Sequence, residues 1–489
     1  MQICAPLRSF GAWLAKSPQP RLVRGSSAPQ AFTGRSSPSS PRPLMKSLLY
    51  TSLTFSIIST LACGDAALAS QDGEERWTQP ELEAVTAEIQ AQVEAIRGEE
   101  FVRPVAVKIT DAEGFLGYAL ARMDEMAGKA KLAAQEDTAK MLGLVPPTMD
   151  LWGVTLEVLE GQVGGFYDPG TETFFLMDSF TGGIAKIILS HELTHALDDQ
   201  LYDIDGTLEG LLENDDATAA YQAVVEGSGT AIMSRWTMEH ISELDPMALV
   251  EAASMGTDSL AAAPPIVWKP MLAAYVSGQQ FLDRGYRVMK KSAGLDFTGV
   301  TKRAFESPPL STEQVLHPDK YWMSDKRDDP IEVSIEWDTL PAGWKRLDET
   351  TLGELTLALM TQEDEKVDFS NPMSLAFMKY TNKAVEGWGG DRLVLLGSEK
   401  ARLLHLFTVW DTPKDAKEFA GALSERLAAW RGDLATLDAE GLGAGVSIGG
   451  PEQGAETIVT ISAWYGLPEA DYKALTASLR VEVGSAGEK

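Results

Sequence analysis

The chain has 489 residues, too many for one ordinary domain, and its 44% hydrophobic and 23% charged residues are typical of a folded globular protein. Its formal net charge of -29 argues against nucleic-acid binding, because the chain has no basic excess with which to replace the counterions of a phosphate backbone. We therefore expect two or three globular domains and a partner other than a nucleic acid.

The N-terminal segment differs from the rest of the chain. Residues 1–44, rich in Ser, Pro and Arg over most of their length, predict a disordered or wrongly assigned extension. Residues 45–69 have the three parts of a secretory signal peptide: Lys46, an apolar run, and the small-residue sequence Ala67-Leu68-Ala69. We expect cleavage before Ser70 and a secreted or periplasmic protein of the cell envelope.

Two alternatives to the signal peptide are a membrane anchor and a lipoprotein. The apolar run is short for a bilayer span, and lipidation at Cys63 would require Leu at the position where this chain has Thr60. Removal of the leader would also remove Cys4 and Cys63, the two cysteines of the chain. The mature protein would then have no membrane span, no disulfide and no thiolate ligand, so any metal would be held by histidines and carboxylates.

The elements after the leader follow from apolar periodicity and turn residues. We expect a helix over 77–98, a strand over 103–110, one or two helices within 111–142, a β-hairpin over 165–177, helices over 183–202 and 214–238, and two or three further helices to about residue 290. The hairpin prediction rests on two aromatic runs that flank the turn sequence Asp168-Pro169-Gly170-Thr171.

A cluster of prolines and the charged sequence SDKRDDP mark a domain boundary near residue 330. Beyond it, strands are predicted over 391–396, 401–410 and 457–466, and a helix over 417–430. GLGAGVSIGG at 441–450 predicts a helix-to-strand turn and not a phosphate loop, because it lacks both GxGxxG and a P-loop Lys. The predicted fold class is α+β: a mostly helical domain with a small hairpin or sheet over 70–330, then a smaller α+β domain over 331–489.

The sequence HELTH at 191–195 has the residues of a catalytic zinc site. His191 and His195 are four residues apart, so they share a helical face and can bind one Zn²⁺. Glu192 lies about 100° around the helix, where it can contact a water on the metal without binding the metal itself. Zinc lowers the pKa of such a water to about 7, and Glu192 would take its proton as a general base. The alternative is a fortuitous pair of surface histidines, but the apolar run IAKIIL before the motif favours a buried helix.

A third ligand is needed, because catalytic zinc has three protein ligands and one open position. Glu226 is the best candidate, since it follows His195 by 31 residues within a second predicted helix and has apolar neighbours that would bury it. An unpaired buried carboxylate is costly, and metal binding would account for it. His240 fits poorly as a ligand, and Leu201 stands where an extended histidine motif would carry its third His.

The HELTH motif with a downstream helical Glu-Gly pair resembles the gluzincin family of zinc metallopeptidases, and the chain is most similar to a group of secreted bacterial gluzincin-like proteins. The resemblance implies a zincin-like fold, one zinc per chain held by His191, His195 and Glu226, and Glu192 as general base. The similar segments are GFYDP (165–169), HELTHALDDQ (191–200), VVEGSGTA (224–231), YVSGQQF (275–281), PPLSTEQVLHPDKY (308–321), Leu352-Gly353-Glu354 and GWGGD (387–391).

The chain departs from this family pattern two and four residues after the third ligand, where Ser228 and Thr230 replace an aspartate that can support a ligand histidine. Asp199, on the face of His195, is our candidate for that supporting role, and Asp198 is the alternative. The oxyanion of the tetrahedral intermediate also needs a donor, commonly Tyr or His.

Three residues are candidates for the oxyanion donor. His317 is the one we assign to catalysis, Tyr321 and Tyr167 are alternatives, and a structural histidine at 317 remains open. His405 lies between Leu404 and Leu406 and is predicted to pack in a strand core.

The predicted function is that of a secreted zinc metallopeptidase that hydrolyses peptide bonds in a peptide or protein substrate. One alternative is a catalytically inactive zincin-fold protein that serves as a binding or regulatory module of the cell envelope. Another is an envelope interaction protein that works through its C-terminal domain. Zinc content distinguishes the envelope interaction protein from the zinc metallopeptidase. Turnover of an unfolded protein distinguishes the peptidase from its inactive counterpart.

Overall fold

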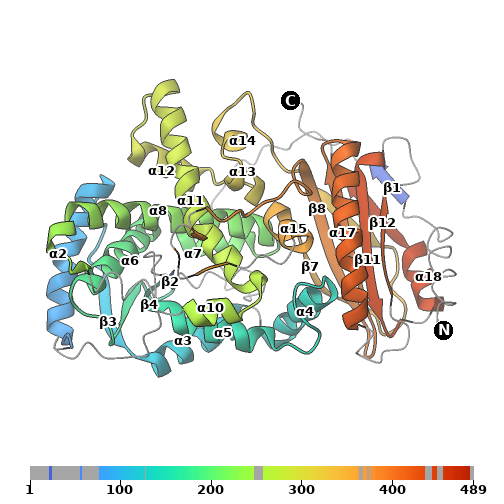
Figure 1. The fold of residues 1–489 in the computed structure, drawn as a ribbon, viewed down its shortest axis with the longest axis horizontal. Helices are drawn as coiled ribbons and strands as arrows, with labels where there is room; N and C mark the ends of the chain where they lie inside the picture. Colours follow the sequence, from blue (N-terminus) through green and yellow to red (C-terminus); the bar gives the residue numbers. More distant parts are fainter. Residues whose placement is uncertain are drawn as a thin grey trace, which may run out of the picture.

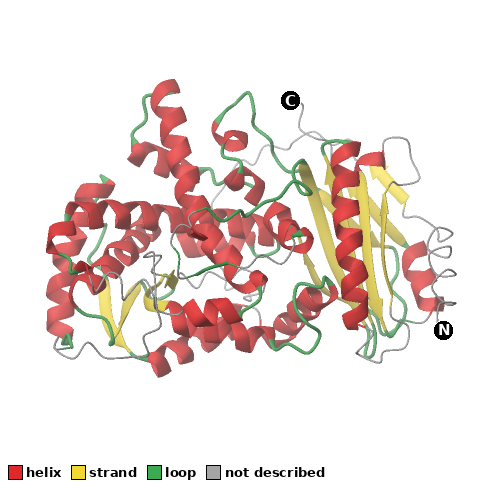
Figure 2. Cartoon of the chain, viewed as in Figure 1, coloured by secondary structure: helices red, strands yellow, loops and turns green. Residues whose placement is uncertain are grey.

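The computed structural model describes residues 21–24, 55–57, 76–126, 128–246, 257–362, 367–369, 371, 374–375, 377–434, 443–448, 455–467 and 469–484. Helices and one small sheet form one side of the molecule, and a β-rich region with two sheets forms the other (Figures 1 and 2). The predicted α+β class is therefore confirmed.

The first region begins with helices around a small sheet. Its elements are α2 (Gln79–Arg97), β3 (Ala106–Thr110), α3 (Ala112–Met126), α4 (Gly128–Met141), α5 (Leu151–Gln162), β4 (Val163–Asp168) and β5 (Thr173–Met177). Glu81 accepts the backbone N–H of Thr78 at 2.7 Å at the start of α2, and the left-handed Gly98 (φ 76°) ends that helix. The predicted hairpin is confirmed, since β4 and β5 pair antiparallel; β3 joins β5 in parallel.

A bundle of helices follows, and it contains the longest helices of the described chain. The elements are α6 (Gly182–Tyr202), α7 (Ile204–Leu211), α8 (Asp215–Glu239), η1 (Ile241–Glu243), α10 (Thr257–Ala262), α11 (Pro265–Ser292), α12 (Phe297–Glu306), α13 (Thr312–Leu316) and α14 (Asp319–Trp322). α6 is buried over most of its circumference, and its buried side chains include the polar residues of the HELTH motif. α8 packs against both α6 and α11.

The second region is built on a five-stranded sheet with the order β10-β11-β9-β8-β7. Its elements are β6 (Val333–Trp337), β7 (Lys345–Thr350), α15 (Gly353–Thr361), β8 (Trp388–Gly397), β9 (Arg402–Trp410), α17 (Pro413–Leu434), β10 (Gly443–Ile448), η3 (Ala455–Thr457), β11 (Ile458–Tyr465), α18 (Glu469–Ala477) and β12 (Leu479–Val483). The strands predicted over 391–396 and 401–410 are confirmed as parts of β8 and β9, which pair antiparallel. The prediction of a turn at 441–450 is wrong in part, because residues 443–448 form the edge strand β10, paired antiparallel with β11.

Both faces of this sheet are covered, because alternate residues of a strand point to opposite sides. On β8, Leu393 and Leu395 pack toward α15 and α17, whereas Val394 and Leu396 pack toward β6, β12 and α18. Met141 of α4 belongs to the first of these two cores, so the helical region contributes directly to the interior of the second region. α15 lies between the helices and the sheet (Figure 1).

Two short strands come from the N-terminal 75 residues. β1 (Arg21–Arg24) pairs in parallel with β12, and β2 (Phe55–Ile57) pairs antiparallel with β4. The other residues of the predicted extension and signal peptide lie outside the described residues, so the leader stays a prediction. None of the helices in the described part of the chain is both long and apolar enough to cross a membrane.

Candidate metal centre

The histidine motif lies in the middle of α6. His191, Glu192 and His195 are each exposed by 1% or less, because α6 is enclosed by β4, α2 and α8. The i, i+4 spacing brings the two imidazole rings within 4.4 Å of each other, centroid to centroid. The histidines therefore form a buried pair and not a surface pair.

The third group comes from α8. Glu226 Oε2 lies 3.2 Å from Nε2 of His191 and 3.3 Å from Nε2 of His195, and the two Nε2 atoms are 2.8 Å apart. Among the described residues, this is the one group of three or more His, Cys, Asp or Glu side chains whose ligand atoms lie within 4.8 Å of one another. The structure thus brings together the three residues that the sequence proposed as ligands.

The spacing of these atoms fits a zinc ion. Ligand atoms bound tetrahedrally at about 2.0–2.2 Å lie about 3.3–3.6 Å apart, so the two nitrogen–oxygen distances agree and the nitrogen–nitrogen distance is shorter by about 0.5 Å. Two imidazole nitrogens and one carboxylate oxygen are also ligand types of catalytic zinc sites. His191, His195 and Glu226 can therefore hold a metal ion with one position left open.

The charges in this pocket favour a cation. Burial lowers the pKa of both histidines, but the Glu226 carboxylate raises the pKa of His195 to about 9. Burial raises the pKa of Glu226, but the charge on His195 and hydrogen bonds to both histidines lower it to about 2. The pocket therefore holds an ionised carboxylate beside a proton, and a metal ion can replace that proton.

Glu192 is held beside the ligands by strand β4. Its Oε2 accepts the backbone N–H of Tyr167 at 2.8 Å, and its side chain is fully buried. It does not belong to the ligand group, as its position next to His191 on the helix predicts. An oriented carboxylate at this place is suited to act as a base toward a water in the open position.

A buried ion pair fixes α6 against its neighbours. Asp198 accepts hydrogen bonds from Nε and Nη2 of Arg97 at 3.2 and 2.9 Å and from Ser228 Oγ at 2.5 Å. Arg97 lies on α2 and Ser228 on α8, and the charged side chains of the pair are fully buried. Ser228 of α8 thus reaches a carboxylate of α6.

Asp199, our candidate for supporting a ligand histidine, makes other contacts in the structure. Its Oδ2 accepts from Tyr167 Oη at 2.9 Å and its Oδ1 from the backbone N–H of Ile204 at 3.0 Å. The Nδ1 atom of His195 is buried without a hydrogen-bond partner among the described residues. Asp199 therefore acts on Tyr167, the residue whose backbone holds Glu192. It also lines a cavity of about 890 Å³ beside the end of α6.

The sequence reasoning missed a glycine that makes room for the ligands. A Cβ on Gly229 would lie 2.7 Å from Cε1 of His191 and 2.9 Å from Cε1 of His195. Only glycine lets both imidazoles lie this close to α8. A signal was present, because Gly229 follows Glu226 by three residues and so shares its helical face.

A second close approach joins α8 to α11. A Cβ on Gly227 would lie 2.4 Å from the carbonyl carbon of Gly278, so the two helices touch backbone to backbone. One turn before Gly278, Tyr275 stacks on His191 with ring centroids 5.8 Å apart. The segment YVSGQQF thus forms a wall of the metal pocket, a role that its sequence did not reveal.

The candidate oxyanion donors lie in different places. His317 Nε2 is 2.9 Å from Oε1 of Glu354, at the contact with the second region, and this hydrogen bond raises the pKa of His317. Tyr321 donates its hydroxyl to the carbonyl of Ser307 and packs edge-on against Trp322. Of the three candidates, Tyr167 is the one in contact with Glu192. His405, predicted to be a core residue, is buried in β9 beside Ser462, and burial lowers its pKa to about 4.

Comparison with known proteins adds one match. Residues 340–459 match a family described as a domain of unknown function, DUF8575. These residues run from just before β7 to the start of β11 and include most of the five-stranded sheet. Comparison with curated proteins and with solved structures gave no match.

Proposed function

We propose that this protein is a zinc-dependent metallopeptidase. The observation that carries the proposal is the buried group of His191, His195 and Glu226 with the oriented carboxylate of Glu192 beside it. The gluzincin-like motif supports the same conclusion from the sequence.

The chemistry follows from the roles of these side chains. Bound zinc would supply a Lewis acid that polarises a carbonyl and makes water nucleophilic at neutral pH. Glu192 would remove the proton of the attacking water and later deliver it to the leaving amine. The hydrogen bond from Tyr167 N–H keeps the Glu192 carboxylate in one orientation, and the burial of the site excludes bulk water.

The strand β4 suggests how a peptide would bind. One edge of β4 pairs with β5, and the other pairs with β2, which lies in the segment predicted to be removed as a leader. An extended peptide that took the place of β2 would add a strand to this sheet and pass close to Glu192. We therefore propose that an exported, mature chain presents this edge to a peptide or protein substrate.

The test is the variant Glu192→Gln, which keeps the size of the side chain and removes the base. We expect zinc content near one per chain in both proteins and a loss of hydrolysis of about 10² to 10⁴ in the variant. The measurement combines metal analysis with mass mapping of a peptide library, with and without a chelator.

Two results would contradict the proposal. A chain that binds no zinc would remove its basis, and an active protein whose Glu192→Gln variant cleaves at the wild-type rate would exclude Glu192 as the base. A wild-type protein that binds zinc but cleaves neither the library nor an unfolded protein would favour the inactive binding module.

A further inference from the structure

The N-terminus of α8, the helix that carries Glu226, is completed by residues of the second region. The first backbone N–H groups of a helix lack partners within the helix and must find them elsewhere. The N–H of Asp215 donates to Thr350 Oγ1 at 2.9 Å, and the N–H of Asp216 donates to the carbonyl of Thr351 at 3.1 Å. The third N–H is capped locally by Asn214 Oδ1 at 3.0 Å. Two of the three therefore depend on the end of β7.

The side chain of Asp216 extends this contact. Its Oδ1 accepts the backbone N–H of Thr312 at 3.0 Å and also the Thr312 hydroxyl. The same hydroxyl oxygen accepts the N–H of Leu355 in α15 at 3.2 Å. Asp216 thus connects α8 through α13 to the first turn of α15.

Gly353 makes this contact possible. It has a left-handed backbone (φ 72°), and a Cβ at this position would lie 1.7 Å from Oδ1 of Asp216. Asp391 on β8 holds the glycine in place by accepting the N–H groups of Leu352 and Gly353 at 2.8 and 2.9 Å. A side chain at position 353 therefore fits only if the Asp216 side chain moves, which would disturb its hydrogen bonds with Thr312.

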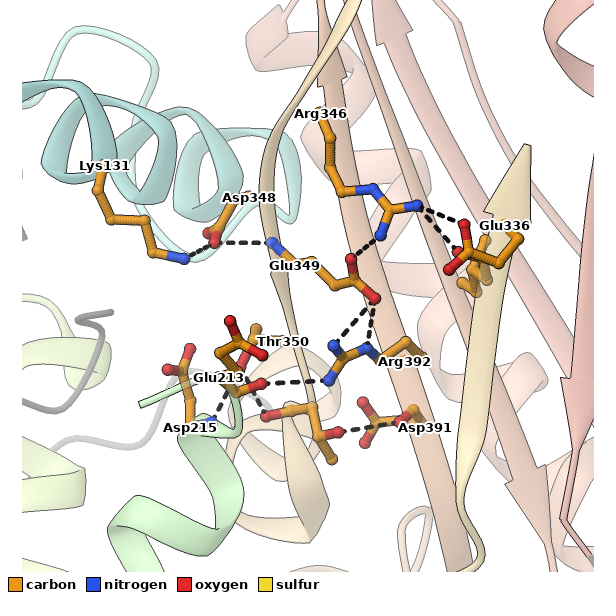
Figure 3. A network of polar contacts seen from close by, with 12 residues as sticks. Lys131, Glu213, Asp215, Glu336, Arg346, Asp348, Glu349, Thr350, Asp391 and Arg392 are labelled. Carbon is orange, nitrogen blue, oxygen red and sulfur yellow. Dashed lines mark hydrogen bonds and ion pairs between the residues drawn. The ribbon is translucent and has the colours of Figure 1, made fainter. Parts of the chain in front are cut away.

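We call the contact of Asp215 and Asp216 with Thr312 and residues 350–355 the joint. Ion pairs surround this joint (Figure 3). Lys131 of α4 pairs with the buried Asp348 of β7. Arg392 of β8 bonds Glu349 at 2.9 Å and also donates to the carbonyl of Glu213, just before α8, at 3.2 Å. Thr312, Gly353 and Asp391 come from three segments far apart in the sequence, and they meet at this contact.

We propose that the C-terminal domain, which includes the segment of unknown function, positions the metal-ligand helix by capping the N-terminus of α8 with Thr350 and Thr351, while Gly353 leaves room for Asp216. A rigid helix carries this constraint along its length: Glu226 lies ten residues after Asp216, or about 15 Å along the axis. Zinc binding requires Glu226 to lie within a narrow range of positions, so a displaced α8 weakens the site. The inference rests on the metal site proposed above, and Thr350 and Gly353 are positioning residues that do not touch the metal.

The first experiment compares Gly353→Ala with Gly343→Ala in the full chain. Both glycines have left-handed backbones, with φ of 72° and 85°, but a Cβ at 343 meets no atom within 4 Å. Both substitutions therefore carry similar backbone strain, and only that at 353 collides with Asp216. We expect Gly353→Ala to weaken zinc binding by about tenfold or more and to accelerate hydrogen exchange at the start of α8, while Gly343→Ala changes neither.

A second pair of variants tests the inference in case Gly353→Ala does not fold. Thr350→Val removes the acceptor of the Asp215 N–H, and Thr412→Val removes a hydroxyl that accepts the Asp415 N–H at the start of α17, remote from α8. We expect zinc affinity to fall by about two- to tenfold in Thr350→Val, the range set by one hydrogen bond, and to stay unchanged in Thr412→Val.

The readouts separate this inference from the proposed function. If wild-type protein binds zinc and the Thr350 and Gly353 variants match their controls in affinity and in exchange of α8, the positioning role is overturned. If wild-type protein binds no zinc, the proposed function fails, and the exchange of α8 still decides whether the C-terminal domain holds this helix.

Discussion

Two carboxylates on the same helix show how neighbours determine the charge of a buried group. Asp216 at the start of α8 and Glu226 near its middle are exposed by 1% and 5%. Burial alone would raise the pKa of both. It does raise the pKa of Asp216 to about 7, with Asp391 and Glu354 adding to the effect, whereas the histidines beside Glu226 lower its pKa to about 2.

The difference separates two uses of a buried carboxylate. Glu226 stays ionised at neutral pH and faces a pair of imidazoles, which is what a metal ligand requires. Burial and two nearby acids favour the protonated form of Asp216, although the two hydrogen bonds from Thr312 oppose this shift, and the residue serves as a joint between regions. The middle of α8 therefore suits a cation, and its start suits a contact that protonation favours.

The largest expected effect comes from removing Glu226, the carboxylate that stays ionised. Glu226→Ala takes away one of three ligand groups and the negative charge of the pocket, so we expect zinc affinity to fall by more than about 100-fold. Competition with a chelator measures the affinity. Glu239→Ala, which removes an exposed glutamate from the same helix, should bind zinc like the wild type. Unchanged affinity in Glu226→Ala would exclude Glu226 as a ligand.

The next effect tests the space around the ligands instead of their charge. Gly229→Ala would push a methyl group against both imidazoles, so we expect zinc affinity to fall by about 10- to 100-fold with all three ligands present. The decisive measurement is the increase in melting temperature that zinc produces, which should shrink in the variant. Gly117→Ala, where a Cβ meets no atom within 4 Å, is the control. Equal loss of stability with and without zinc would indicate a purely structural glycine.

The sequence predicts the candidate metal site near the middle of α8 much better than the contacts at the start of this helix, and the reason is physical. His191, Glu192 and His195 follow from the spacing of one helix, and Glu226 follows from the cost of burying a carboxylate. Asp216 lies in the first turn of α8. Its contacts with residues 312 and 353 depend on tertiary structure, which has no local pattern.

The fold shows a similar contrast between elements with a clear local sequence pattern and elements without one. The helices predicted over 77–98, 183–202 and 417–430 agree with α2, α6 and α17, whereas α5 was missed. The sequence of α5, LWGVTLEVLEGQ, has two glycines and β-branched residues that weaken the helical pattern, and Asp150 caps it by accepting the Gly153 N–H at 3.0 Å. The glycine-rich strand β10 was predicted as a turn because its strand state depends on pairing with β11.

A smaller effect is the pH dependence of protein stability that Asp216 causes at the joint. Asp216 has a raised pKa, so its contribution to stability is full below its unfolded value near 4 and is lost as pH rises through about 7. The free energy of unfolding should therefore fall across this window, by about 1.4 kcal/mol per pH unit where the two states differ by one proton. Asp216→Asn should reduce this slope in urea titrations, whereas the exposed Asp124→Asn should leave it unchanged.

Other groups at the joint titrate in the same direction, so part of the slope should remain in Asp216→Asn. Burial raises the pKa of Asp391 to about 6 and that of Glu313 to about 8, although Arg392 and Lys320 oppose these shifts. If the free energy of unfolding of Asp216→Asn has the same slope with pH as the wild type, Asp216 is ionised in the folded protein. Its pKa would then not differ in direction from that of Glu226.

The smallest effect concerns His317, which the sequence suggested as an oxyanion donor and the structure places beside Glu354. That contact raises the pKa of His317, so its stabilisation is full below about 6.5 and is lost as pH rises through the folded value. The ring is 33% exposed, so solvent weakens the contact, and we expect His317→Ala to cost about 1 kcal/mol at pH 6 and less at pH 9. Zinc affinity and turnover per folded molecule should not change.

His240→Ala, at the opposite end of α8, controls for the loss of a histidine near this helix. A drop in turnover of about 10² to 10³ in a fully folded His317→Ala protein would instead place His317 at the reacting carbonyl, and the joint would then be part of the active site.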